Sequence, residues 1–95
     1  MKLFWTLAAR ADLRDILGYI AANNPAKARE VVGRIREYTD NLTEFPRMGR
    51  EGRSHGTREL VIPKLPYLVV YTLIDEATLH VLRVWHARRR FPERF

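Results

Sequence analysis

GTRELVIPKLPYLVVYTLIDEATLHVLRVWHA occupies residues 56–87 and decides the fold of this chain. Prolines and acidic residues divide it into three apolar runs, at 58–62, 67–74 and 78–85. Short apolar runs bounded by such turn residues predict strands that are joined by hairpins. The run at 67–74 is apolar at nearly every position, which indicates a central strand that is covered on both faces.

Two amphipathic helices are predicted between a short first strand at 2–6 and these three strands. Apolar residues at helical spacing form one stripe before the Asn24-Pro25 break and a second stripe after it. The first comprises Ala9, Leu13, Ile16, Leu17 and Ile20, and the second Ala28, Val31, Val32, Ile35, Tyr38, Thr39 and Leu42. Thr6 is a suitable N-cap for the first helix, and Asn24 followed by proline predicts the start of the second.

The order of these elements predicts fold class α+β. Because the break between the helices is short, they must fold back on each other as an antiparallel hairpin, and each has one apolar face to bury. We expect the order β-α-α-β-β-β in a single domain over 1–95, with a small antiparallel sheet packed against the helix hairpin. Residues 46–56 contain three glycines and three arginines. We expect them to form a mobile, solvent-exposed loop.

The composition limits the class of protein. No cysteine is present, which excludes disulfides and thiolate metal sites and suits a reducing, cytoplasmic location. No apolar run reaches the roughly 20 residues that a helix needs to cross a bilayer, so we expect no membrane association. The start of the chain turns polar by Arg10 and Asp12, which argues against a signal peptide.

Positive charge is concentrated in the second half of the chain. The whole chain has a formal net charge of +6. Residues 1–45 hold seven Lys/Arg and six Asp/Glu, a net charge of +1, whereas residues 46–95 hold ten and five, a net charge of +5. The arginines cluster in 47–58 and 88–90, which favours a surface for a polyanion or for an acidic protein partner.

Familiar enzyme signatures are missing from the sequence. The glycines at 49, 52 and 56 do not lie between a strand and a helix, as a phosphate-binding loop requires. No two of His55, His80 and His86 lie three to five residues apart, so we expect no metal site. An enzyme that depends on a metal or a nucleotide cofactor is therefore not indicated.

One group of side chains is still able to carry chemistry: Arg58, Arg83 and His86, with Glu59, Arg50 and Arg53 nearby. A ribonuclease that uses the 2′-hydroxyl of RNA needs a base, an acid, and cations that stabilise the transition state. Arginine supplies the charge, and histidine moves protons near neutral pH. Each residue also fits a structural role, since an arginine can pair with a carboxylate and a histidine can hydrogen-bond at a strand end. Trp5 and Trp85 fit core positions.

Several short motifs, taken in order, resemble a known family. They are Ala11-Asp12-Leu13, Tyr19-Ile20-Ala21, Asn24-Pro25-Ala26, Gly56-Thr57-Arg58-Glu59-Leu60, Pro66-Tyr67, Val70-Tyr71 and Val84-Trp85-His86-Ala87-Arg88. With the β-α-α-β-β-β order, the chain resembles the RelE/ParE superfamily of bacterial type II toxins over nearly its whole length. RelE-like members cut mRNA in the ribosomal A site, whereas several ParE-like members poison DNA gyrase and are not nucleases.

Within that superfamily, this chain is more similar to the ParE-like branch. RelE-like members usually have lysines on the second strand and an arginine after the aromatic residue that opens the third. Here the second strand has no lysine, and Leu68 follows Tyr67. A lost transition-state donor typically lowers a rate by about 10²–10³. The arginine-rich segment after His86 also looks ParE-like.

The resemblance implies a toxin that binds DNA gyrase, arrests growth and is neutralised by a cognate antitoxin in a hetero-oligomeric complex. It implies no cofactor, no metal and no favoured catalytic residue. The target contacts would be Arg58, Arg83, His86, Arg88, Arg89 and Arg90, with Arg50 and Arg53 as secondary contacts. The antitoxin would place an amphipathic, acidic segment on the helix hairpin or the sheet.

Two alternatives stay open at this point. The first is a RelE-like, metal-independent, ribosome-dependent mRNA endonuclease that uses Arg58 and Arg83 for charge stabilisation and His86 for proton transfer. The second is a protein-interaction module without toxicity. Growth arrest on expression would separate the module from the other two functions.

Overall fold

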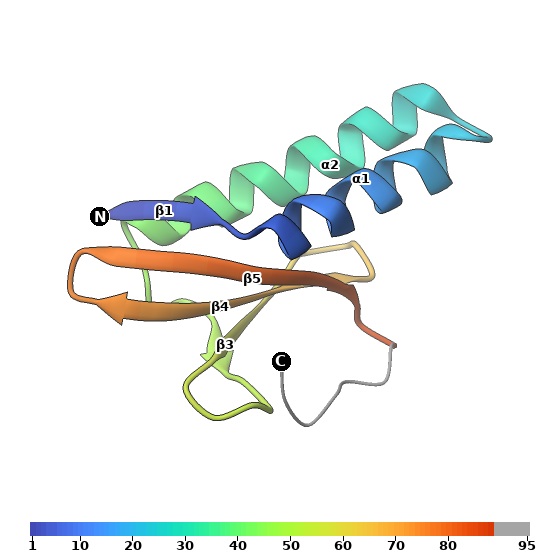
Figure 1. Cartoon of the computed structure of the whole chain (residues 1–95). Coiled ribbons are helices and arrows are strands. Elements are labelled where there is room, and N and C mark those ends of the chain that lie inside the picture. Colours follow the sequence, from blue (N-terminus) through green and yellow to red (C-terminus); the bar gives the residue numbers. More distant parts are fainter. Residues whose placement is uncertain (89–95) are drawn as a thin grey trace.

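Residues 1–88 fold into two helices that cover one face of a five-stranded sheet (Figure 1). The structure is a computed structural model and describes residues 1–88. Its elements are β1 (Lys2–Trp5), α1 (Leu7–Ala21), α2 (Pro25–Asp40), the 3₁₀ helix η1 (Asn41–Thr43), β2 (Arg50–Glu51), β3 (Arg58–Val61), β4 (Tyr67–Asp75) and β5 (Thr78–His86). The predicted α+β fold, with its helix hairpin on a small sheet, is confirmed.

Both helices begin at the residues that the sequence indicates. The Thr6 hydroxyl accepts a hydrogen bond from the backbone N–H of Ala9 at 3.1 Å, which caps α1. The Asn24 side chain accepts one from Lys27 at 3.1 Å, and Pro25 occupies the first turn of α2. A side-chain oxygen at the N-cap satisfies a backbone donor that has no partner inside the helix. The two caps therefore fix where the hairpin starts and where it reverses.

The sheet is mixed, with strand order β1-β5-β4-β3-β2. Strands β2 to β5 pair in antiparallel fashion, but β1 pairs with β5 in parallel. The expectation of a wholly antiparallel sheet is corrected in this respect. A hairpin turn fixes the antiparallel direction of its two strands. No such turn joins β1 to β5, because both helices and three strands separate them in the chain.

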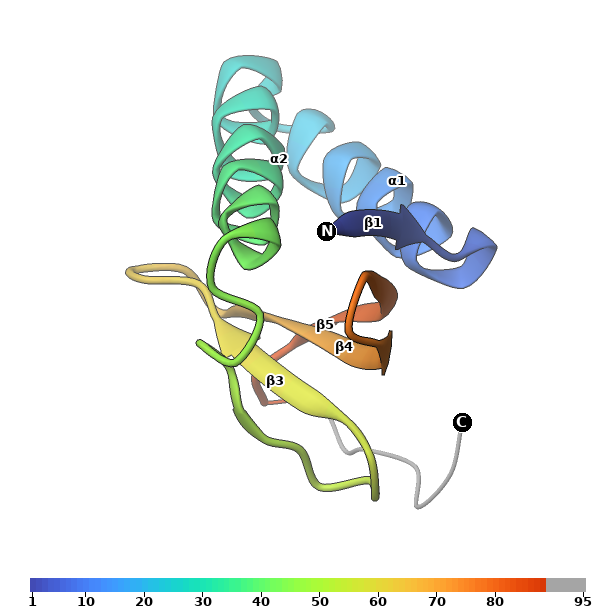
Figure 2. The same cartoon turned by 90° about the vertical axis from the view of Figure 1, so that its left-hand side faces the viewer.

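The main core lies between the helix hairpin and the sheet, and Figure 2 shows both helices on the same side of it. Its fully buried members include Ile35 of α2, Leu42 of η1, and Val69, Tyr71 and Leu79 of the sheet. A second, smaller cluster of Leu68, Val70 and Trp85 occupies the other face. Strand β4 therefore contributes buried residues to both faces, as its unbroken apolar run predicts.

The expectation of a loop at 46–56 is corrected at two residues, where the structure has a short strand. Arg50 and Glu51 form strand β2, which pairs with Glu59 and Arg58 of β3. Gly49 is buried, because its backbone lies against the ring of Tyr71. Arg50 and Glu51 therefore form an edge of the sheet. Within residues 1–88, neither helix has the length and apolar character needed to cross a membrane.

Candidate target-binding surface

Arg83 takes its position from a β-bulge. The register of β5 against β4 shifts by one residue at Leu82, which has no opposite residue on β4. Such an insertion exchanges the two faces of a strand from that point onward. Val84 consequently packs in the core beneath the helices, while Trp85 joins the cluster on the other face. The Arg83 guanidinium lies 5.2 Å from the centre of the Trp85 ring.

Arg83 forms a two-point ion pair with Asp12 of α1. Its Nε and Nη2 donate to the two carboxylate oxygens at 2.8 and 2.9 Å. The same carboxylate accepts a third hydrogen bond, at 2.9 Å, from the backbone N–H of Val84. Asp12 is only 8% exposed. These hydrogen bonds raise the pKa of Arg83, and its charge is balanced inside the fold.

Arg50 and Arg53 are both paired with Glu59, which is 3% exposed. The Arg50 Nη2 donates to one carboxylate oxygen at 3.1 Å, and the Arg53 backbone N–H donates to the other at 3.0 Å. The Arg53 Nε lies 3.7 Å from the first oxygen. The buried Glu59 carboxylate thus balances part of the positive charge of Arg50 and Arg53, which were predicted to contact the target.

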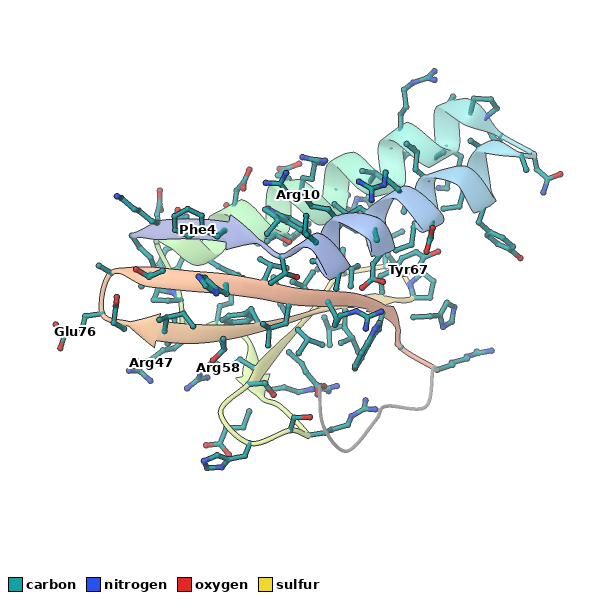
Figure 3. All side chains as sticks on the ribbon, viewed as in Figure 1. Phe4, Arg10, Arg47, Arg58, Tyr67 and Glu76 are labelled. Atoms are coloured by element: carbon teal, nitrogen blue, oxygen red, sulfur yellow. The ribbon has the colours of Figure 1, made fainter. Side chains whose placement is uncertain are left out.

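Arg58 keeps its charge at the surface. Its Nη1 donates to the main-chain carbonyls of Gly49 and Arg47, at 2.7 and 3.3 Å. Within residues 1–88 no carboxylate lies within ion-pairing distance of it. Carbonyl acceptors orient a guanidinium without neutralising it. Figure 3 shows Arg58 and Arg47 pointing away from the helix hairpin, on the opposite side of the molecule from Arg10.

Tyr71 holds the segment that orients Arg58. Its hydroxyl donates to the Pro46 carbonyl at 2.7 Å and accepts from the Gly49 N–H at 2.9 Å. A Cβ on Gly49 would lie 2.7 Å from the Tyr71 ring, so only glycine fits there. Burial raises the pKa of the Tyr71 hydroxyl, because the interior disfavours its charged form.

His86 and Arg88 lie at the other end of the sheet and are both exposed. The His86 ring packs edge-on against Tyr67, with centroids 5.7 Å apart. Its Nδ1 accepts a hydrogen bond from the Arg88 backbone N–H at 3.2 Å. The predicted contacts Arg89 and Arg90 lie outside the described residues.

The three residues of the nuclease hypothesis are not brought together. Arg58 is opposite Tyr71 on β4, whereas His86 is opposite Tyr67. Four residues of a strand span about 13 Å, since each advances about 3.3 Å. Arg58 and His86 also flank β4 on different sides, and Arg83 is held by Asp12. One phosphodiester could not contact all three side chains in this arrangement.

A groove on the helix hairpin was not predicted from the sequence. It has a volume of about 470 Å³ and an apolar floor that includes Trp5, Leu13, Leu17 and Val32. Arg10, Arg14 and Arg36 line its rim, and the Arg36 guanidinium lies 6.0 Å from the Trp5 ring centre. The i, i+4 spacing of Arg10 and Arg14 beside Leu13 and Leu17 is the signal that could have revealed it.

No metal site is evident in the described part of the chain. Among residues 1–88, no three His, Asp or Glu side chains are grouped closely enough to hold a metal ion. The surface around Arg47 and Arg58 and the groove on the helix hairpin are features of this region that are suited to binding a partner.

The amino-acid sequence of this chain is similar to those of known proteins. Residues 3–91 match the family model described as ParE toxin of the type II toxin-antitoxin system parDE. The chain is 38% identical to a protein named as a toxin, Y4kP of Sinorhizobium fredii, over 97% of this chain and 94% of that protein. It is 33% identical to Toxin RelE2 of Caulobacter vibrioides, over 93% and 97%.

A solved structure gives the same result. It is titled Chromosomal ParDE TA system from P. aeruginosa, and the TM-score is 0.81 with 28% sequence identity. The match covers 90% of this chain and 95% of that chain. The agreement therefore extends over nearly the whole of both chains.

Proposed function

Because this chain belongs to the ParE family of type II toxin–antitoxin toxins, we propose that it arrests bacterial growth by binding and inhibiting DNA gyrase. The ParE-like branch noted from the sequence implies that target. We also propose that the toxin acts in the cytoplasm and that a cognate antitoxin neutralises it in a hetero-oligomeric complex. The function is inhibition by binding, without chemical modification of the target.

The separation of Arg58, Arg83 and His86 is the observation that carries this proposal. Metal-independent RNA cleavage needs an acid, a base and a cation around one phosphate. Here the arginine and the histidine occupy different ends of the sheet, and Asp12 holds the second arginine. Binding a protein surface has no such requirement, because separate charges can each meet their own partner.

We propose the predicted basic residues as the target contacts. We rank them by their exposure and by whether a carboxylate of the fold pairs with them. Arg58 comes first, because within residues 1–88 its guanidinium donates to carbonyls and pairs with no carboxylate. Arg88 and His86 follow because they are exposed, and Arg89 and Arg90 continue the basic segment. Arg50, Arg53 and Arg83 come last, since Glu59 balances part of the charge of the first two and Asp12 balances that of Arg83.

Expression of the toxin without antitoxin tests this function. We expect growth arrest with chromosomal DNA breaks and an SOS response, while transcripts stay intact. His86→Ala and Arg83→Lys should retain most of the arrest, and Arg58→Glu should weaken it. Primer-extension stops within translated mRNA that vanish in His86→Ala would instead establish the nuclease. Harmless expression of soluble, folded protein would leave only the interaction module.

The hairpin groove is the site that we propose for the antitoxin. Its floor is apolar and its rim carries Arg10, Arg14 and Arg36. None of these arginines forms an ion pair with a carboxylate of residues 1–88. An amphipathic segment with acidic residues along one side complements such a groove in both shape and charge.

Reversing one rim charge tests this site. We expect Arg36→Glu to weaken antitoxin binding by about 100-fold, because a like charge would then face the acidic segment. The matched control is Arg29→Glu, an equal charge change at an exposed α2 position outside the groove. It should change the dissociation constant by about threefold or less, since it alters only long-range attraction. Calorimetric titration of both variants with the antitoxin measures this, and equal losses would refute the site.

A further inference from the structure

A polar hollow of about 420 Å³ lies beside the β2–β3 connection. Its wall includes Arg47, Glu51, Ser54, His55, Arg58 and Leu73. These side chains come from the segment before β2, from β2, from the connection itself, and from strands β3 and β4. The hollow is separate from the hairpin groove, with which it shares no residue.

The Arg58 side chain of the wall is held in place before any ligand arrives. The carbonyls of Gly49 and Arg47 engage only the Nη1 of Arg58. A guanidinium has five N–H donors, so its Nη2 and Nε edges stay available for a second, two-point contact. The Arg47 side chain supplies a second guanidinium to the same hollow.

The connection that forms the rest of the wall is also closed by hydrogen bonds. Gly52 N–H donates to the Thr57 carbonyl at 2.8 Å, and the Thr57 hydroxyl donates to the Ser54 carbonyl at 2.6 Å. Thr72 of β4 donates to the Gly56 carbonyl at 2.7 Å. A Cβ on Gly52 would lie 2.2 Å from the Thr57 Oγ1, so this closure requires glycine. The wall is consequently preorganised, which lowers the entropic cost of binding.

We propose that this hollow binds a phosphate group. Its lining combines Arg47, Arg58 of β3, and Ser54 and His55 of the connection, so potential donors come from three chain segments. A tetrahedral anion can accept hydrogen bonds from several directions at once, whereas the two oxygens of a carboxylate lie in one plane. Arginine pairs with phosphate at two points, as with carboxylate, and is the residue that favours such contacts.

Glu51 is the one acidic residue of the wall. It is opposite Arg58 in the β2–β3 pair, yet the two side chains form no ion pair. Its negative charge opposes an incoming anion, so the affinity for a single phosphate should be modest. Removal of this charge should strengthen phosphate binding, which gives the proposal an unusual gain-of-affinity test.

NMR titration of the isolated toxin with inorganic phosphate, at constant ionic strength, measures this binding. We expect the backbone signals of residues 47–58 to shift in a saturable way. Arg58→Gln should weaken binding by about tenfold and Arg47→Gln by about threefold, as expected for charge-assisted contacts. Glu51→Gln should strengthen it by about threefold. Arg10→Gln, which removes the same charge at the hairpin groove, should leave it within about twofold.

Two further ligands identify where the phosphate comes from. A nucleoside diphosphate and a short DNA duplex are titrated separately, and the tighter one indicates a free nucleotide or a nucleic-acid backbone. A glutamate-rich peptide is the carboxylate comparison. The proposal is overturned if the peptide binds more tightly than every phosphate ligand, if Glu51→Gln weakens binding, or if Arg10→Gln matches Arg58→Gln. The test does not involve gyrase, so its outcome is independent of the target proposed above.

Discussion

Asp12→Ala is expected to lower the free energy of unfolding by about 3 kcal/mol. The substitution removes three hydrogen bonds at once: two from Arg83 and one from the backbone N–H of Val84. It leaves that backbone donor buried without its acceptor, and it leaves Arg83 without a counter-charge. The Arg83 side chain is 32% exposed, so water compensates part of its loss. Denaturant unfolding followed by circular dichroism measures the effect.

Asp15→Ala is the matched control for this prediction. Asp15 is on the same helix, is exposed and pairs with no cation of residues 1–88. Its loss should change stability by about 0.5 kcal/mol or less. In a double-mutant cycle with Arg83→Ala, the pair should show a coupling energy above about 1 kcal/mol. A small effect of Asp12→Ala, similar to that of the control, would mean that the ion pair does not hold α1 to β5.

Tyr71→Phe is expected to destabilise the protein by about 2 kcal/mol and to loosen the segment that holds Arg58. The change deletes only the hydroxyl, which donates to Pro46 and accepts from Gly49. Tyr71 is fully buried, so no water can replace these hydrogen bonds without rearrangement. Hydrogen exchange should become faster at Gly49, the residue whose N–H donates to the hydroxyl.

The pH dependence of the free energy of unfolding at alkaline pH is a second test of the role of Tyr71. Burial raises the pKa of Tyr71 above the usual tyrosine value of 10.0. The folded state therefore holds this proton more tightly, and the stabilisation is complete below pH 10 and lost as the pH rises through the folded-state pKa. The native protein should thus lose stability above pH 10, and Tyr71→Phe should lose less. Some dependence stays, because burial also raises the pKa of Tyr67.

Tyr19→Phe serves as the control for both Tyr71 experiments. The Tyr19 side chain is 82% exposed, so loss of its hydroxyl should leave the free energy of unfolding nearly unchanged. Its loss of stability at alkaline pH should stay close to that of the native protein but be slightly smaller, because the Tyr19 phenolate also raises the pKa of Tyr67. If Tyr71→Phe were as stable as Tyr19→Phe, the hydrogen bonds between the Tyr71 hydroxyl and the segment at 46–49 would not contribute to stability.

Local patterns were sufficient to predict both helices and the four longer strands. The two helical stripes, the Thr6 and Asn24 caps and the apolar runs of the last three strands depend on neighbouring residues, and each is confirmed. The parallel pairing of β1 with β5 was missed because it joins residues more than seventy positions apart. Strand β2 was missed because it consists of only two residues, both charged, and therefore shows no alternation of apolar and polar positions.

The bulge at Leu82 had the largest effect on predictions about the site. On alternation alone, Leu79, Val81, Arg83 and Trp85 share one face of their strand. The register shift turns Arg83 and Trp85 to the face opposite the helices. Arg83 nevertheless reaches Asp12 of α1, whose carboxylate also accepts from the Val84 backbone N–H. A bulge inserts a residue without any fixed sequence signal, so this consequence depends on tertiary packing. The basic residues themselves were identified, but their internal partners were not.

Inhibition of gyrase by purified toxin tests the central claim most directly. DNA supercoiling by gyrase is measured with increasing toxin, alone and after addition of excess antitoxin, while mRNA integrity is followed in a translating extract with the same preparation. The account predicts that the toxin blocks supercoiling, that antitoxin restores it, that Arg58→Glu weakens the block, and that the mRNA stays whole. Unimpaired supercoiling together with ribosome-dependent mRNA cleavage would contradict it.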